Sequence, residues 1–157
     1  MTIFIQEVQR VLWFSFPGCL RVGIQQIRDV WTWNEFYYHA MSSLDLALVE
    51  KAWAHNDYVT LVGPRHAAPM IGWTDIRAYY AKAVSTIGKI SLRPIDPHIN
   101  VNGDYAWIVA REEIGADSRL KDGSPLSTRP TISTNVFEKI GGKWLMVSHH
   151  AQEIHGA

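Results

Sequence analysis

Two adjacent histidines near the end of the chain, His149 and His150, have the side chains best suited to acid–base chemistry. A neutral imidazole with a pKa of about 6.5 can accept or donate a proton near neutral pH. Both lie in an expected strand over 144–151, where adjacent residues point to opposite faces of the sheet. Counting in steps of two, Trp144 shares one face with Met146, Ser148, His150 and Gln152, and His150 on that face could act as a general base. The alternative is that His150 only satisfies a buried polar partner or lies at a dimer seam.

Further polar side chains lie on the neighbouring expected strands. Asn135 has an amide that can both donate and accept a hydrogen bond. Arg111 and Glu113 alternate onto one face with Trp107, where they could form an ion pair or bind a ligand carboxylate. A solvated strand end is the alternative for these two charges. Tyrosine pairs at 37–38 and 79–80 offer phenol donors, but aromatic pairs at helical spacing are usually core. We therefore expect one of each pair to face a pocket.

Metal and cofactor sites find little support in the sequence. His55 and Asp57 are close together, but no third ligand is in register, so we predict a loop that ends a helix and no metal site. Cys19 is the only cysteine, which excludes an intramolecular disulfide and a cysteine-rich zinc site. His66, in a short loop, is a candidate for a pocket rim or a merely exposed residue. No cofactor is expected.

Composition indicates a globular protein of one domain. The chain has 157 residues, of which 47% are apolar and 19% charged, and its formal net charge is zero. One domain of about 100–200 residues is the default for this length. A chain without excess positive charge lacks the electrostatic signature of a nucleic-acid binder or a polybasic membrane module. We therefore expect a cytoplasmic protein that binds neither nucleic acid nor membrane.

Hydrophobic periodicity predicts three helices and a run of strands. Apolar residues recur at steps of three and four from Val30 to Leu44, and the second and third helices are expected over 44–54 and about 73–87. Ser42 or Ser43 is the expected N-cap of the second helix. A strand is expected between these two helices, at 58–62. After the third helix the apolar pattern changes to a period of two, which predicts strands at 90–92, 99–101, 105–114, 131–138 and 144–151. Helices packed on one face of a bent antiparallel sheet make an α+β fold.

Residues 1–30 form the least regular part of the chain. An apolar run over 11–20 is too short for a membrane span, which needs about 20 residues. A secretory signal peptide is the sharper alternative, although Glu7 leaves no clearly positive leading segment. We expect an extension of uncertain order over 1–30, with a helix break at Pro17-Gly18, and a domain over 31–154. Export through the apolar segment is the less favoured reading.

Several short segments resemble the SnoaL-like branch of the nuclear transport factor 2-like superfamily, which also includes ketosteroid isomerases and the association domain of calmodulin-dependent kinase II. The resemblance covers about residues 31–153 and rests on segments at 33–38, 52–60, 72–77, 103–107, 134–137 and 142–151. It implies a cone-shaped fold, in which three helices close a pocket lined by a curled sheet, and usually a homodimer built through the sheet. The family pattern has His at the place of His150 and Ser at the place of Gln152, so the resemblance implies that His150 is the catalytic residue and that the serine hydroxyl is lost.

A pocket of this kind implies a small, largely apolar ligand, because such sites combine an apolar lining with a few polar groups. The predicted ligand-binding residues are Tyr38, Trp73, Tyr80, Trp107, Arg111, Asn135 and Ser148. Two functions stay open: a pocket protein, with or without acid–base chemistry from His150, and a non-catalytic dimeric association module. Isomerase chemistry by the family mechanism is not expected, since Gly63, before Pro64, stands where those enzymes keep a carboxylate base. An epoxide-hydrolase site with an Asp-Arg-Asp arrangement is not found either.

Overall fold

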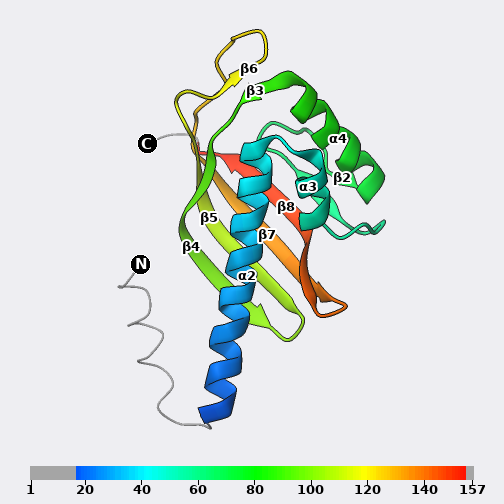
Figure 1. Ribbon diagram of the computed structural model, residues 1–157, viewed down its shortest axis with the longest axis vertical. Helices are drawn as coiled ribbons and strands as arrows, with labels where there is room; N and C mark the ends of the chain where they lie inside the picture. Colours follow the sequence, from blue (N-terminus) through cyan, green and yellow to red (C-terminus); the bar gives the residue numbers. More distant parts are fainter. Residues whose placement is uncertain (1–16, 155–157) are drawn as a thin grey trace.

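Three helices and eight strands make up the described part of the chain (Figure 1). The structure is a computed structural model that describes the backbone of residues 17–154 and the side chains of residues 23–154. The helices are α2 (Pro17–Ser43), α3 (Leu46–Ala52) and α4 (Trp73–Thr86). The strands are β1 (Thr60–Val62), β2 (Met70–Ile71), β3 (Ile87–Lys89), β4 (Leu92–Asn102), β5 (Tyr105–Ile114), β6 (Arg119–Leu120), β7 (Thr131–Ile140) and β8 (Lys143–Glu153). The predicted α+β class is confirmed.

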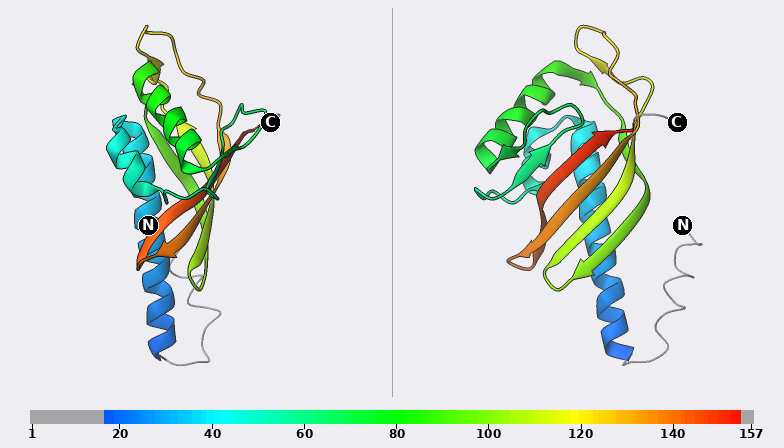
Figure 2. Two further views of the ribbon diagram at one scale, coloured as in Figure 1. Left: turned by 90° about the vertical axis from the view of Figure 1, so that its right-hand side faces the viewer. Right: turned by 180° about the vertical axis from the view of Figure 1, so that it is seen from behind.

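The main sheet has six strands in the order β2-β1-β8-β7-β5-β4, and β3 and β6 form a separate two-stranded sheet. β1 runs parallel to β8, whereas the other pairs are antiparallel. Figure 2 shows that α2, α3 and α4 lie on one face of the main sheet. The opposite face carries no helix among the described residues (Figure 2, right). We call these the inner face and the outer face.

Alternation along the strands builds the core between the inner face and the helices. In β5, Ala106, Ile108 and Ala110 are buried, and the residues between them are more exposed. Helix α2 contributes Val30 and Tyr37, which are seven residues apart and therefore share one helical face. These side chains form one apolar core between the sheet and the helices. Its other buried apolar members include Ala40, Val49, Trp53, Val59, Leu61, Ile76, Tyr80, Phe137, Trp144 and Met146.

The first helix begins earlier than its apolar pattern indicated. Pro17 was expected to break a helix, but α2 starts at this residue and continues without interruption to Ser43. Proline is tolerated in the first turn, where its missing N–H would have no helical partner. Residues 17–30 of the expected extension are therefore part of α2, and its remaining residues, 1–16, lie outside the described residues. Among the described residues, no helix is both long and apolar enough to cross a bilayer.

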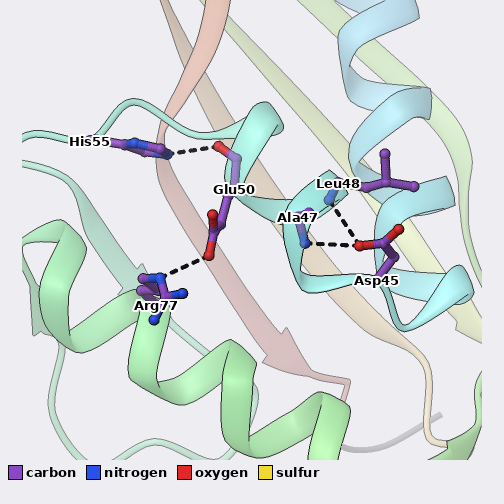
Figure 3. A network of polar contacts seen from close by, with 6 residues as sticks. All are labelled: Asp45, Ala47, Leu48, Glu50, His55 and Arg77. Carbon is purple, nitrogen blue, oxygen red and sulfur yellow. Dashed lines mark hydrogen bonds and ion pairs between the residues drawn. The ribbon is translucent and has the colours of Figure 1, made fainter.

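Helix α3 is held at both ends by polar contacts (Figure 3). Its N-cap is Asp45 rather than the predicted Ser42 or Ser43, and Asp45 Oδ1 accepts from the N–H groups of Ala47 and Leu48 at 2.9 and 3.3 Å. Beyond its other end, His55 Nε2 donates to the Glu50 carbonyl at 2.8 Å. His55 therefore closes the chain after a helix, as the sequence predicted.

Candidate functional site

The last strand contains one irregularity that decides which residues face the helices. Opposite β7, Met146 pairs with Phe137 whereas Ser148 pairs with Val136, so Val147 is an extra residue in β8. A β-bulge of this kind inserts one residue into one strand only. Since side chains alternate with a period of two, the insertion reverses the alternation expected beyond it.

The bulge places His149, and not His150, on the inner face. His149 is only 7% exposed and pairs across the sheet with Asn135 and Leu61, whereas His150 is exposed. The prediction that His150 faces the interior is therefore wrong. It failed because counting from Trp144 in steps of two assumes an unbroken alternation.

The His149 imidazole is held on one side and unbonded on the other. Its Nδ1 lies 2.7 Å from Asn135 Oδ1. Its ring packs at a tilt against Tyr37, with the ring centroids 5.5 Å apart. No described residue forms a hydrogen bond with Nε2. The imidazole thus has a fixed orientation and one nitrogen that is not hydrogen-bonded by the described residues.

Asn135 connects His149 to helix α2. Its Nδ2 donates to Asn34 Oδ1 at 2.8 Å and to the Tyr38 hydroxyl at 3.3 Å. Asn34 and Tyr38 are four residues apart in α2, so both point to the same side of that helix. All of these side chains are buried, with Asn34 at 0%, Asn135 at 1% and Tyr38 at 3% exposure. The inner face therefore carries polar groups that are bonded to one another rather than to water.

A carboxylate closes the far end of this network. Glu112, in β5, is 4% exposed, and its Oε1 and Oε2 accept from the hydroxyls of Tyr38 and Thr131, both at 2.7 Å. Ser133 Oγ lies 3.2 Å from the Tyr38 hydroxyl. Among the described residues, no lysine or arginine forms an ion pair with Glu112. A buried carboxylate without a cation depends on hydrogen bonds for its stability.

Aromatic side chains surround the polar network. The hydroxyls of Tyr37 and Tyr80 lie 3.2 Å apart, and burial raises the pKa of both phenols above the ordinary value of 10, so they stay protonated. His66, in the loop after β1, accepts from the Gly63 N–H at 2.9 Å through Nδ1. Its ring meets Tyr79 edge-on, with centroids 5.0 Å apart. His66 is half-buried.

Burial also decides the charge of His149. Because a buried site disfavours the charged imidazolium, the pKa of His149 lies below its ordinary value of 6.5. Glu112 acts in the opposite direction, whereas the positive forms of His150 and His66 lower the pKa further. At neutral pH His149 is therefore an uncharged imidazole, which is the form that accepts a proton.

The structure brings together three of the predicted site residues, Tyr38, Tyr80 and Asn135, near the inner face. Trp73 lies at the start of α4, where its ring stacks on His55 with centroids 4.3 Å apart. The prediction that Trp73 joins the same cluster is not supported by any contact with these three residues among the described side chains.

The remaining predicted residues lie on the outer face. Trp107 is 39% exposed and Arg111 is exposed, because they alternate with the buried Ile108 and Ala110. Ser148 lies on the same face, where it accepts from Thr60 Oγ1 at 2.8 Å. Placing these side chains in an inner pocket was wrong. Arg111 does meet Glu113, at 3.3 Å, as one of the alternatives foresaw.

Sequence reasoning missed most of the polar network. Glu112 carried a usable signal, since a carboxylate alternated with Ile108 and Ala110 on an apolar strand face. Asn34 carried another signal, because a residue four positions before Tyr38 lies on the same side of the predicted helix. No local signal marked the bulge at Val147, so His149 could not be preferred over His150.

Among the hollows at the surface of the described residues are two that His149 does not line. One, of about 290 Å³, lies on the outer face and is lined by Ile132, Thr134, His150, Gln152, Glu153 and Ile154. The other, of about 280 Å³, lies between α2 and the β7–β8 turn. His150 thus lines a hollow, but not the helix-covered one that was predicted. Within residues 17–154, no cluster of three or more metal-ligating side chains is found.

Comparisons with known proteins agree with this arrangement. The sequence pattern of the SnoaL-like domain matches residues 30–151, which is most of the chain. The protein belongs to the SnoaL-like family. The resemblance to this family predicted from short segments is thereby confirmed. No curated protein matches the chain.

Solved structures of similar proteins place this SnoaL-like domain in the nuclear transport factor 2-like superfamily. A candidate dehydratase of that superfamily from Streptomyces avermitilis is 26% identical, with a TM-score of 0.74, over 84% of this chain and 98% of its own. A candidate calcium/calmodulin-dependent protein kinase type II association domain from Thiobacillus denitrificans is 23% identical, with a TM-score of 0.66, over 78% and 93%. A ketosteroid isomerase-like protein from Erwinia carotovora is 16% identical, with a TM-score of 0.68, over 83% and 98%. The last two show the fold alone.

Proposed function

We propose that this SnoaL-like protein binds a small, largely apolar and uncharged molecule at the inner face, and that His149 supplies acid–base chemistry there. The observation that carries the proposal is the His149 imidazole, which is buried, oriented by Asn135 and unbonded at Nε2 by the described residues. A neutral imidazole with a free nitrogen in an apolar setting is a competent general base.

The surroundings of His149 suit an uncharged aromatic or alicyclic ligand. Tyr37 and Tyr80 supply ring surface, and the phenols stay protonated because burial raises their pKa. The carboxylate of Glu112, which no described cation neutralises, opposes a second buried negative charge. Removal of water requires proton transfer, so the likeness to a candidate dehydratase supports acid–base catalysis as the kind of chemistry.

The test uses 2-naphthol, an uncharged aromatic alcohol whose hydroxyl can donate to an imidazole, with phenol and cyclohexanol as smaller probes. Binding is followed by fluorescence and by thermal shift for the wild type, His149→Phe and His150→Phe. The two variants remove neighbouring imidazoles from opposite faces of the same strand. Loss of one hydrogen bond should weaken binding by about tenfold in His149→Phe only.

Two outcomes would end the proposal. One is that the wild type binds none of the three probes. The other is that both variants lose affinity equally, because that would place the probe elsewhere or show a general loss of folding.

An association module is the second candidate, and the outer face favours it. Tyr105, Trp107 and Ile132 are 53%, 39% and 51% exposed on neighbouring strands that no described helix covers. Val109 lies between Trp107 and the register position of Ile132 on this face, and an exposed apolar patch marks an interaction surface. We propose that a second copy of the chain covers this face and forms a homodimer through the sheet.

Sedimentation analysis tests the homodimer with matched charge substitutions. Trp107→Glu places a carboxylate on the outer face, whereas Ile71→Glu places one on an apolar residue that is 60% exposed in β2, at the edge of the sheet. We expect a dimeric wild type, a monomeric Trp107→Glu variant and a dimeric Ile71→Glu variant. A monomeric wild type, or a Trp107→Glu variant that stays dimeric, would remove this proposal.

A further inference from the structure

The hydrogen bonds from His149 to Glu112 form a continuous chain with a direction. His149 Nδ1 meets Asn135 Oδ1, Asn135 Nδ2 donates to the Tyr38 hydroxyl, and that hydroxyl donates to Glu112 Oε1. The three distances are 2.7, 3.3 and 2.7 Å. Each member thus contacts the next, from the imidazole in β8 through β7 and α2 to the carboxylate in β5.

The carboxylate end determines the direction of this chain. An ionised carboxylate only accepts hydrogen bonds, so Tyr38 and Thr131 must both donate to Glu112. A phenol has one proton, and once that proton is directed to Glu112 the Tyr38 oxygen can only accept from its other partners. Asn135 therefore turns its NH₂ group toward Tyr38 and its carbonyl oxygen toward His149.

Asn34 does not decide this orientation. Its Oδ1 accepts from Asn135 Nδ2 at 2.8 Å, but its own Nδ2 has no hydrogen-bond partner among the described residues. If Asn135 turned its amide, Asn34 could turn as well and donate to the new oxygen. Only the Tyr38 contact would then become unfavourable, because two oxygens without a shared proton would face each other.

We infer that Glu112, acting through Tyr38 and Asn135, is a positioning residue that fixes the tautomer of His149. Since the Asn135 oxygen accepts, His149 has its proton on Nδ1 and the lone pair on Nε2. The nitrogen left unbonded by the described residues is therefore an acceptor. The inference also defines the ligand of the proposed function, on which this part rests: it presents a hydrogen-bond donor, or an acidic C–H group, to Nε2.

Nitrogen-15 NMR of the His149 ring tests the tautomer without any ligand. Spectra are recorded above pH 7, where the imidazole is neutral, and His149 is assigned from the signal missing in His149→Phe. The wild type should be protonated at Nδ1. A wild type protonated mainly at Nε2 would overturn the inference by itself, even if no variant folds.

Adjacent tyrosines in α2 give matched variants. Tyr38→Phe removes the hydroxyl that links Glu112 to Asn135. Tyr37→Phe removes a neighbouring buried hydroxyl that bonds Tyr80 and is not part of the hydrogen-bond series from His149 to Glu112. Tyr38→Phe should lower the ratio of the Nδ1–H to the Nε2–H form by about tenfold, and Tyr37→Phe should leave it unchanged. Equal ratios in the two variants would contradict the inference.

A double variant distinguishes loss of the hydrogen-bond series from general damage to the fold. In Tyr38→Phe/Asn135→Asp both oxygens at position 135 accept, and Asn34 can turn to donate to one of them. Nδ1 protonation of His149 should therefore return without Tyr38. Persistence of the Nε2–H form in the double variant would contradict the inference that the Asn135 orientation fixes the tautomer.

A pair of probes connects the tautomer to the ligand. The wild type should prefer 2-naphthol, which can donate to Nε2, over 2-methoxynaphthalene, which cannot, and Tyr38→Phe should reduce that preference. If neither probe binds, the proposed function fails while the NMR result still decides the tautomer. If both bind wild type equally while Nδ1 is protonated, the donor-bearing ligand class is wrong.

Discussion

The inner and outer faces of the sheet are built from the same three strands, β5, β7 and β8, and both carry polar side chains. On the inner face Glu112, Asn135 and His149 are at most 7% exposed, and each bonds to another protein group. On the outer face His150 is exposed, and Arg111 and Glu113 form an exposed ion pair. The faces thus differ less in how polar they are than in which partners satisfy their polar groups.

Helix α2 explains this difference. It places Asn34 and Tyr38 against the inner face, so that buried amide, imidazole and carboxylate groups find partners there. A buried polar group without a hydrogen-bond partner lowers the stability of the fold. Removing one member of the network therefore destabilises the protein through every neighbour that loses its partner. Outer polar groups can exchange a lost partner for water. The comparison therefore predicts large effects inside and small effects outside for the same chemical change.

The largest effect is expected for removal of a ring. Phe137 is fully buried at 0% exposure, so Phe137→Ala should lower the free energy of unfolding by about 3–5 kcal/mol through lost burial and a remaining cavity. Tyr105 is 53% exposed in the neighbouring strand, and Tyr105→Ala should cost at most about 1 kcal/mol. Urea denaturation followed by tryptophan fluorescence measures both. Similar losses in the two variants would mean that the outer face is as well packed as the inner one.

A smaller effect is expected for neighbouring polar residues on opposite faces. Asn135→Leu keeps the approximate shape of the side chain but leaves Asn34, Tyr38 and His149 without their shared partner. We expect a loss of about 1–3 kcal/mol. Thr134→Val is also nearly isosteric, but Thr134 lies on the outer face and should change stability by about 0.5 kcal/mol or less. The same denaturation experiment compares them, and an Asn135→Leu variant as stable as the wild type would show that the network contributes little.

The strands and helices behind these two faces were only partly predictable from the sequence. The period of two identified β5, β7 and β8 closely, and the helical period identified α4 and the C-terminal half of α2. The two-residue strands β2 and β6 escaped notice because such short strands depend on pairing with another segment rather than on a pattern of their own. The strand β4 was predicted as two pieces, since Pro94 and Pro97 interrupt its pattern. As an edge strand, β4 can include prolines that have no N–H to donate.

The site was less predictable than the fold for a related reason. β8 pairs with β7 on one side, whereas on the other side Met146 pairs with Trp53 and Ser148 pairs with Thr60. The change of partner coincides with the extra residue Val147. No pattern within β8 records that change, because it arises from segments that are about 90 residues away. Asn135 and Tyr38 were found by residue type alone, and their relation to Glu112 appears only when three elements are assembled.

The smallest effect is expected from pH and concerns the two histidines. The pKa of His149 is lower in the folded protein than its ordinary value of 6.5, mainly because of burial. Protonation therefore favours the unfolded chain: the stability from neutral His149 is fully present above about pH 6.5 and is lost as pH falls through the folded pKa. For a single group the slope cannot exceed about 1.4 kcal/mol per pH unit.

The free energy of unfolding, measured between pH 5 and 8, should fall with acid less steeply in His149→Phe than in the wild type. His150→Phe should flatten the slope much less than His149→Phe does, since His150 is exposed on the outer face and adds only a smaller part to the lowering of the His149 pKa than burial does. If His150→Phe flattens the slope and His149→Phe does not, the assignment of the two imidazoles to opposite faces is reversed and the comparison fails at its centre.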